Sequence, residues 1–146
     1  GKLLSEQKVY SEKYLIAGTV DLLEDCDKII YIYDLKTYKK VLKDGETVNL
    51  SFKLQNNWNI DSDEVVQLYI SYPGSKVDRP MKELRGFKRV FVPKGQTIDL
   101  IIPINSDDLK YWDVNTKSFV LEKGTVSFFL GGSSADPRLT GEFRTE

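Results

Sequence analysis

Carboxylates are the most abundant side chains in this sequence that could carry out acid–base or nucleophilic chemistry, with 22 Asp and Glu residues among 146. Two such groups facing each other can act as a general acid and as a nucleophile or base, as in the hydrolysis of sugars. The adjacent Asp107 and Asp108 are the most obvious pair. Acidic residues also favour the first turn of a helix, and Asn105 or Ser106 directly before them could cap such a turn. We therefore interpret this pair as part of a capped helical turn.

The composition excludes several other kinds of site. The chain has no histidine, which excludes Ser-His-Asp and Cys-His catalysis and every zinc site that uses histidine. The single cysteine, Cys26, cannot form an internal disulfide or a thiolate zinc site by itself. Its neighbours Glu24, Asp25 and Asp27 disfavour a thiolate, so we expect an inert thiol. We expect no cofactor and no metal.

Charge and glycine patterns offer two weaker candidates. Residues 36–40, KTYKK, combine lysines with an aromatic ring, as nucleic-acid-binding segments do. The segment is short and the net charge is −1, so we expect a solvated face and no nucleic-acid partner. Residues 131–134, GGSS, could form an anion-binding nest. They lack the lysine and the following helix of a phosphate-binding loop, so a turn is expected.

Trp58 is the side chain with the clearest capacity to bind a ligand. It lies between Asn57 and Asn59, in a polar stretch over residues 56–63 that predicts a loop. A tryptophan ring in such a loop can stack on a sugar ring. It can equally close one end of the fold or contact another domain.

The elements that must position these residues are short strands separated by turns. Residues 48–54 alternate between apolar and polar side chains, which indicates a strand with one buried face. Residues 65–72 predict a second such strand, with Val66, Leu68 and Ile70 on the apolar side. Further strands are predicted at residues 29–33, 84–92, 97–102, 117–121, 125–130 and 139–143, with turns at 43–46, 73–74, 93–96 and 122–124. This spacing predicts an all-β sandwich or barrel.

The length suits one domain, which we expect over residues 29–146. Residues 1–28 are interpreted as an extra strand or a docking arm, although residues 5–7 could also open a helix. No apolar run approaches the ~18 residues that a membrane span needs, so no membrane insertion is expected. No signal peptide is visible, and the start at Gly1 rather than Met predicts a piece of a longer protein.

Several motifs resemble one known family. Residues 64–70, EVVQLYI, are similar to a strand of the fibronectin type III-like domain at the C-terminus of family 3 glycoside hydrolases. Residues 80–90, PMKELRGFKRV, resemble the central motif of that domain. Residues 111–112, 119–124 and 131–136 resemble its closing hairpin and terminal loop, in the same order and with similar spacing. The resemblance covers residues 50–143, and residues 32–36 match the first strand more weakly.

The resemblance implies an immunoglobulin/fibronectin-III-like β-sandwich of about seven strands. It implies structural rather than catalytic roles for the motif residues, which are Glu64, Gln67, Tyr69, Pro80, Glu83, Leu84, Gly86, Phe87, Trp112 and Gly131. Apart from the family, Gly86 inside a strand predicts a bulge or a close backbone approach, and Pro80 suits entry into an edge strand. Phe87 and Trp112 are expected to be large apolar anchors.

By the same resemblance, the parent protein would be a retaining β-glycosidase of the β-glucosidase or β-xylosidase type, periplasmic or secreted. Its catalytic residues would lie in preceding domains, and this domain would be a non-catalytic module that docks on them. Two alternatives remain from the residues themselves. A carbohydrate-binding module predicts an exposed aromatic platform, and a free-standing adhesion or assembly domain predicts a surface without a large apolar patch.

Overall fold

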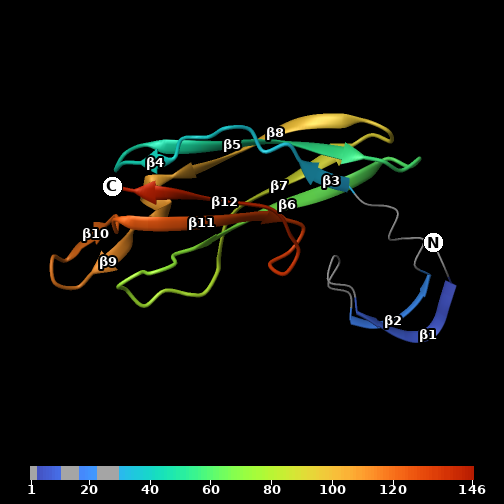
Figure 1. Ribbon diagram of the computed structural model, residues 1–146, viewed down its shortest axis with the longest axis horizontal. Helices are drawn as coiled ribbons and strands as arrows, with labels where there is room; N and C mark the ends of the chain where they lie inside the picture. Colours follow the sequence, from blue (N-terminus) through green and yellow to red (C-terminus); the bar gives the residue numbers. More distant parts are fainter. Residues whose placement is uncertain (1–2, 11–16, 23–29) are drawn as a thin grey trace.

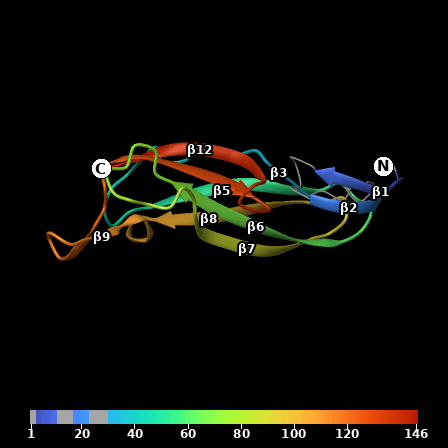
Figure 2. The ribbon, with the colours of Figure 1, turned by 90° about the horizontal axis from the view of Figure 1, so that it is seen from below.

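The computed structural model describes residues 3–10, 17–22 and 30–146, and most of these residues lie in β-strands (Figure 1). One sheet has the order β3-β5-β8, from β3 (Ile30–Tyr33), β5 (Thr47–Asn56) and β8 (Thr97–Asn105). The other has the order β4-β12-β11-β6-β7, from β4 (Val41–Leu42), β6 (Ser62–Ser71), β7 (Glu83–Val92), β11 (Gly124–Gly131) and β12 (Pro137–Thr145). Figure 2 shows the two layers from below. The predicted all-β sandwich is confirmed.

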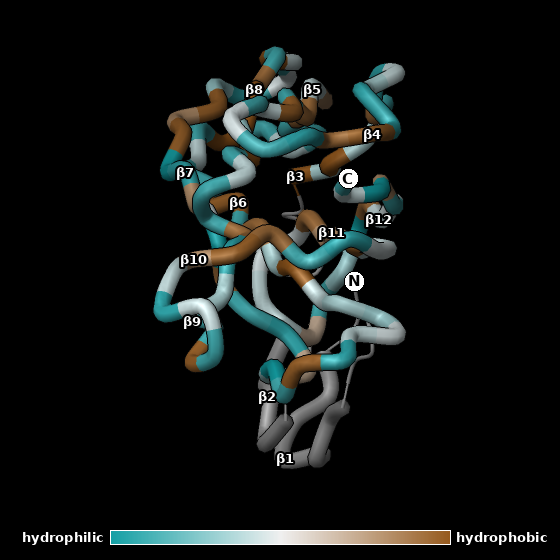
Figure 3. The backbone as a smooth tube through the Cα atoms, turned by 90° about the vertical axis from the view of Figure 1, so that its left-hand side faces the viewer, coloured by the Kyte–Doolittle hydropathy of each residue, from teal (hydrophilic) through white to brown (hydrophobic). Residues whose placement is uncertain are grey.

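Alternation of side chains explains why these segments form strands with one buried face. In β5, Val48, Leu50, Phe52 and Leu54 are buried while the residues between them face outwards. Strands β6 and β11 contribute every second residue in the same way, and hydrophilic and hydrophobic colours alternate along the chain in Figure 3. A single buried cluster joins the inner faces of both sheets. Each fully buried Leu or Phe contributes roughly 1.5–3 kcal/mol relative to an exposed one.

The chain crosses from one sheet to the other between β3 and β4. Strand β3 pairs with β5, whereas β4 lies parallel to β12, with Val41 opposite Arg144 and Leu42 opposite Thr145. The Arg144 N–H donates to the Lys40 carbonyl at 2.8 Å, which extends this pairing. In the part of the chain that the structure describes, eight strands form the two facing sheets. The two-residue strand β4 was not among the predicted strands.

The connection from β8 to β11 contains a short helical turn and a hairpin. The turn η2 (Ser106–Leu109) is capped by Asn105, whose side chain accepts a hydrogen bond from the Asp107 N–H at 2.9 Å. This confirms the predicted capped turn. The hairpin that follows pairs β9 (Tyr111–Asp113) with β10 (Ser118–Val120). The strand pattern did not predict β9, but the family resemblance placed residues 111–112 in a closing hairpin, as observed.

Strands β1 (Leu3–Tyr10) and β2 (Ala17–Leu22) form an antiparallel two-stranded sheet of their own. The helix considered for residues 5–7 is wrong, because these residues lie in β1, which pairs with β2. Cys26 and residue 29 lie outside the described residues. The described helical segments include none long and apolar enough to cross a membrane.

Candidate functional site

Large apolar side chains gather on the outer face of the five-stranded sheet, along β6 and β7. Leu84 and Phe91 are about half exposed, Phe87 is 70% exposed and Val65 is also exposed. We call these four residues, with Tyr69, the β7 face. The register places Phe87 opposite Gln67 and Leu84 opposite Tyr69, so side chains of both strands point to the same side of the sheet. The core-facing residues of β6 lie on the other side of the sheet, so the β7 face points away from the core.

A bulge in β7 turns Leu84 towards this face. The pairing passes from Leu68 opposite Gly86 to Tyr69 opposite Leu84, so Arg85 is the extra residue. A Cβ atom on Gly86 would lie 3.3 Å from the Ile102 Cγ2 atom, which is tight packing. The glycine therefore lets β7 approach β8 at the bulge, as the sequence predicted for this position.

The polar groups within and beside the β7 face are bonded to one another. The Arg89 Nε–H donates to Asp63 Oδ2 at 3.1 Å, and the Tyr69 hydroxyl donates to the Gln67 side-chain oxygen. Beside the face, the Arg85 guanidinium donates to the Glu83 carboxylate. The surface is thus apolar with internally neutralised polar groups.

A second exposed aromatic surface lies on the β9–β10 hairpin. Trp112 and Phe119 pack edge to face with their ring centroids 5.2 Å apart, and Phe119 is 66% exposed. The Asp113 carboxylate fixes the turn by accepting hydrogen bonds from the Asn115 N–H and the Thr116 hydroxyl, each at 3.0 Å. These bonds lower the pKa of Asp113. Within this chain, Trp112 and Phe87 are therefore exposed rather than anchored in the core.

Trp58 is half-buried in the loop between β5 and β6. Its backbone N–H donates to the Asn56 side-chain oxygen at 2.9 Å. The buried Asn56 side chain also donates to the carbonyls of Ile60, at 2.8 Å, and Val92, at 3.0 Å. These hydrogen bonds of the Asn56 side chain hold the loop at the end of the sandwich. Sugar stacking by Trp58 stays a prediction.

The carboxylates of the motif segments lie in ion pairs. Glu64 lies 3.7 Å from the Arg138 guanidinium, which also donates to Asp136 Oδ2 at 2.9 Å. Burial raises the pKa of Glu64, although the Arg138 charge opposes this. Gly131 adjoins this cluster, and a Cβ atom there would lie 1.9 Å from the Asp136 carbonyl oxygen, so no larger residue fits without movement. These contacts explain in structural terms why a glutamate at position 64 and a glycine at position 131 suit this fold.

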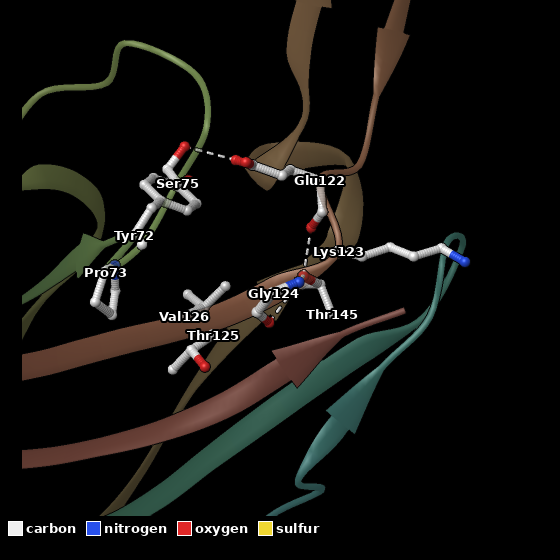
Figure 4. A pocket seen from close by; sticks show the side chains of 10 residues that line it. Tyr72, Pro73, Ser75, Glu122, Lys123, Gly124, Thr125, Val126 and Thr145 are labelled. Atoms are coloured by element: carbon white, nitrogen blue, oxygen red, sulfur yellow. Dashed lines mark hydrogen bonds between the residues drawn. The ribbon is translucent and has the colours of Figure 1, made fainter.

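The loop between β6 and β7 is tied to the end of β10 and the start of β11. Figure 4 shows Ser75 and Glu122 converging there, where the Ser75 hydroxyl donates to Glu122 Oε2 at 2.7 Å. The cavity between them, about 20 Å³, has room for roughly one water molecule. Burial acts to raise the pKa of Glu122, but the hydrogen bonds from Ser75 and Lys76 and the charge of Arg79 outweigh it and lower the pKa. Pro80 lies exposed in this loop, before β7 begins.

Acidic side chains are the remaining candidates for chemistry among the described residues. Within the described ranges, no cluster of three or more Asp, Glu or Cys side chains could hold a metal ion. The carboxylate pair considered from the sequence, Asp107 and Asp108, lies on the exposed turn η2, where Asp107 is 2.7 Å from the Lys110 amine. Alternation within strands pointed to outward-facing residues, but not to which of them cluster. That clustering depends on the register of β6 and β7.

Residues 64–134 match the family model described as a fibronectin type III-like domain. The chain is 38% identical over 94 residues to a probable β-glucosidase D of Aspergillus flavus and 39% identical over 94 residues to a probable β-glucosidase L of Emericella nidulans. Each match covers 64% of this chain and 12% or 13% of the relative, so the chain corresponds to about an eighth of their length.

Solved structures give the same similarity. A β-glucosidase from Kluyveromyces marxianus in complex with glucose matches 82% of this chain and 14% of its own, with a TM-score of 0.73 and 28% identity. A family 3 β-glucosidase from Bifidobacterium adolescentis matches 80% of this chain and 17% of its own, with a TM-score of 0.73. At 23% identity, the second match shows the shared fold.

Proposed function

Since the chain carries a fibronectin type III-like domain of the kind present in family 3 β-glucosidases, we propose that it is a non-catalytic accessory domain that stabilises a longer β-glycosidase by docking on its catalytic part. The parent would be a retaining enzyme of the β-glucosidase or β-xylosidase type. Its two catalytic carboxylates would lie outside this chain. A periplasmic or secreted location is part of the same proposal.

The exposed apolar surface is the observation that carries this proposal. The sandwich already has a complete buried core, yet large apolar residues such as Phe87, Phe91 and Phe119 remain exposed. Exposed apolar surface of this kind is typical of interaction sites. A free-standing adhesion or assembly domain is expected to have a self-sufficient surface, so this observation favours docking.

Deletion tests the accessory role. The parent polypeptide would be prepared with and without residues 30–146, and the half-life of its aryl β-glucoside hydrolysis at elevated temperature would be compared. We expect the deletion to shorten the half-life severalfold, and the isolated chain to show no hydrolysis. An unchanged half-life, or hydrolysis by the isolated chain, would contradict the proposal.

Carbohydrate binding is a second candidate, favoured by the exposed pair of Trp112 and Phe119. Affinity electrophoresis through gels containing laminarin, xylan or cellulose derivatives tests it, with Trp112→Ala and Trp58→Ala as comparison variants. Retardation by one glycan that Trp112→Ala abolishes would make the hairpin a sugar site. If only Trp58→Ala abolished the retardation, the sugar site would lie in the loop after β5. If no glycan retarded the wild-type domain, carbohydrate binding would be wrong and the accessory role would stand.

A further inference from the structure

We infer that the β7 face, rather than the β9–β10 hairpin, is the surface through which this domain contacts the catalytic part of its parent chain. The inference rests on the proposed accessory function and adds to it the location and chemistry of the contact. It assigns one occupant, an uncharged and largely apolar patch on the catalytic part.

Continuity of the surface is the first argument. Phe91, Phe87 and Leu84 lie along the outer side of β7, with the Asp63-paired Arg89 between Phe91 and Phe87. Val65 and Tyr69 lie beside them on β6. They form one patch on two adjacent strands of a rigid sheet. The exposed apolar residues of the hairpin lie instead at a turn of only two three-residue strands. An extended flat face suits a domain–domain contact better than a short turn does.

The state of the polar groups is the second argument. Covering a charged or polar side chain is costly when it then lacks a partner. On the β7 face, Arg89 is already paired with Asp63, and the Tyr69 hydroxyl is already bonded to Gln67. A partner can therefore cover these groups without supplying opposite charges, and only the desolvation of the exposed Arg89–Asp63 pair opposes it, which is why the inferred occupant is uncharged.

The position of β7 in the sheet is the third argument. Among the described strands, β7 pairs only with β6 and is the last strand of its sheet. It is ten residues long, and its exposed residues are three apolar ones and the basic Arg85, Lys88 and Arg89. The basic residues and the bulge of β7 disfavour pairing with the edge of another molecule, so the exposed apolar side chains are better covered through their outer face than through the strand edge. A covalently attached catalytic part would be present at high effective concentration and would cover this face without a tight intrinsic affinity.

The length of the relatives is the reason for choosing the catalytic part of the parent chain as the occupant. The matched region makes up only 12% or 13% of the curated β-glucosidases and 14% of the Kluyveromyces marxianus structure. Chains of this kind therefore contain much more polypeptide than the domain, and that polypeptide is available to meet the face.

Two matched variants test the inference in the full-length parent chain, Phe87→Ser on the β7 face and Phe119→Ser on the hairpin. The two side chains are 70% and 66% exposed, so both variants should fold, and the melting temperature of the isolated domain is measured for each as a baseline. In the parent, we expect Phe87→Ser to shorten the half-life of heat inactivation severalfold, and Phe119→Ser to leave it unchanged.

The deletion of residues 30–146 distinguishes the two levels of the claim. If the deletion destabilises the parent but Phe87→Ser does not, or if Phe119→Ser has the larger effect, the location on the β7 face is wrong and the accessory role stands. If the deletion has no effect, the accessory role itself fails. Hydrogen exchange in the parent adds a second readout, with protection of β7 amides expected in the wild type relative to the isolated chain.

Discussion

The Asn56 side chain holds the loop that contains Trp58 onto the sandwich, so replacing it with alanine is a direct test of how the domain end is stabilised. Asn56 is 1% exposed and makes three side-chain hydrogen bonds, to the Trp58 N–H and to the carbonyls of Ile60 and Val92. Alanine removes all three and leaves a small cavity. The amide N–H and the two carbonyls then have to find other partners.

The expected cost follows from those three bonds. Each hydrogen bond contributes about 1 kcal/mol, and a buried group left without its partner costs about 1–3 kcal/mol. The Asn56–Val92 bond is buried, whereas the bonds at Trp58 and Ile60 are nearer to solvent. We therefore expect Asn56→Ala to lower the free energy of unfolding by about 3 kcal/mol. For a domain of this size, that corresponds to a melting temperature lower by roughly 10 °C.

Urea unfolding followed by far-ultraviolet circular dichroism measures this cost, with Asn57→Ala as the matched control. Asn57 is exposed and adjacent, so its replacement should change the free energy of unfolding by less than about 0.5 kcal/mol. Asn56→Asp keeps the acceptor for the Trp58 N–H but loses both donors, and should be at least as costly as alanine at pH 7. If Asn56→Ala cost no more than Asn57→Ala, the hydrogen bonds would not stabilise the domain end.

Three further changes test other parts of the structure. Gly131→Ala should clearly lower the melting temperature, because the added Cβ would lie 1.9 Å from the Asp136 carbonyl oxygen. Gly124→Ala is the control and should have little effect, because nothing lies within 4 Å of its added Cβ. Equal melting temperatures of the two variants in thermal melts would contradict this reasoning. Leu50→Ala in the core should cost about 2–5 kcal/mol in urea unfolding, and a cost below 1 kcal/mol would contradict its full burial. Glu122→Gln should destabilise the domain at neutral pH, since the pKa of Glu122 is lowered in the folded state. This contribution is fully present above the ordinary carboxyl pKa of 4.5 and is lost as the pH falls through the lowered pKa of the folded state, so the difference between the melts of the variant and the wild type should be smaller at pH 3 than at pH 7.

Local patterns made much of the fold predictable. The alternation in residues 48–54 and 65–72 depends only on neighbouring residues, and the structure places both segments in strands with the expected buried side. Turn glycines were equally informative, and Gly45, Gly74 and Gly95 all adopt positive φ angles in predicted turns. These signals are local, so a single sequence is enough to recognise them.

Long-range pairing limited the remaining predictions. Strand β4 has two residues and exists because it lies beside β12, about 100 residues later in the chain. The ion pair between Glu64 and Arg138 depends on a similar long-range approach. Phe87 and Trp112 were expected to be anchors, and composition alone could not show that they face away from the core of this chain.

The parallel pairing of β4 with β12 also determines how the domain responds to a pulling force. Tension that draws β4 and β12 in opposite directions along their length would load their backbone hydrogen bonds in shear, so that these bonds must break together. The bonds from Arg144 to Lys40, at 2.8 Å, and from Glu146 to Leu42, at 3.1 Å, lie in this seam. Because the seam is short, we expect it to resist such tension less than a longer parallel pairing would.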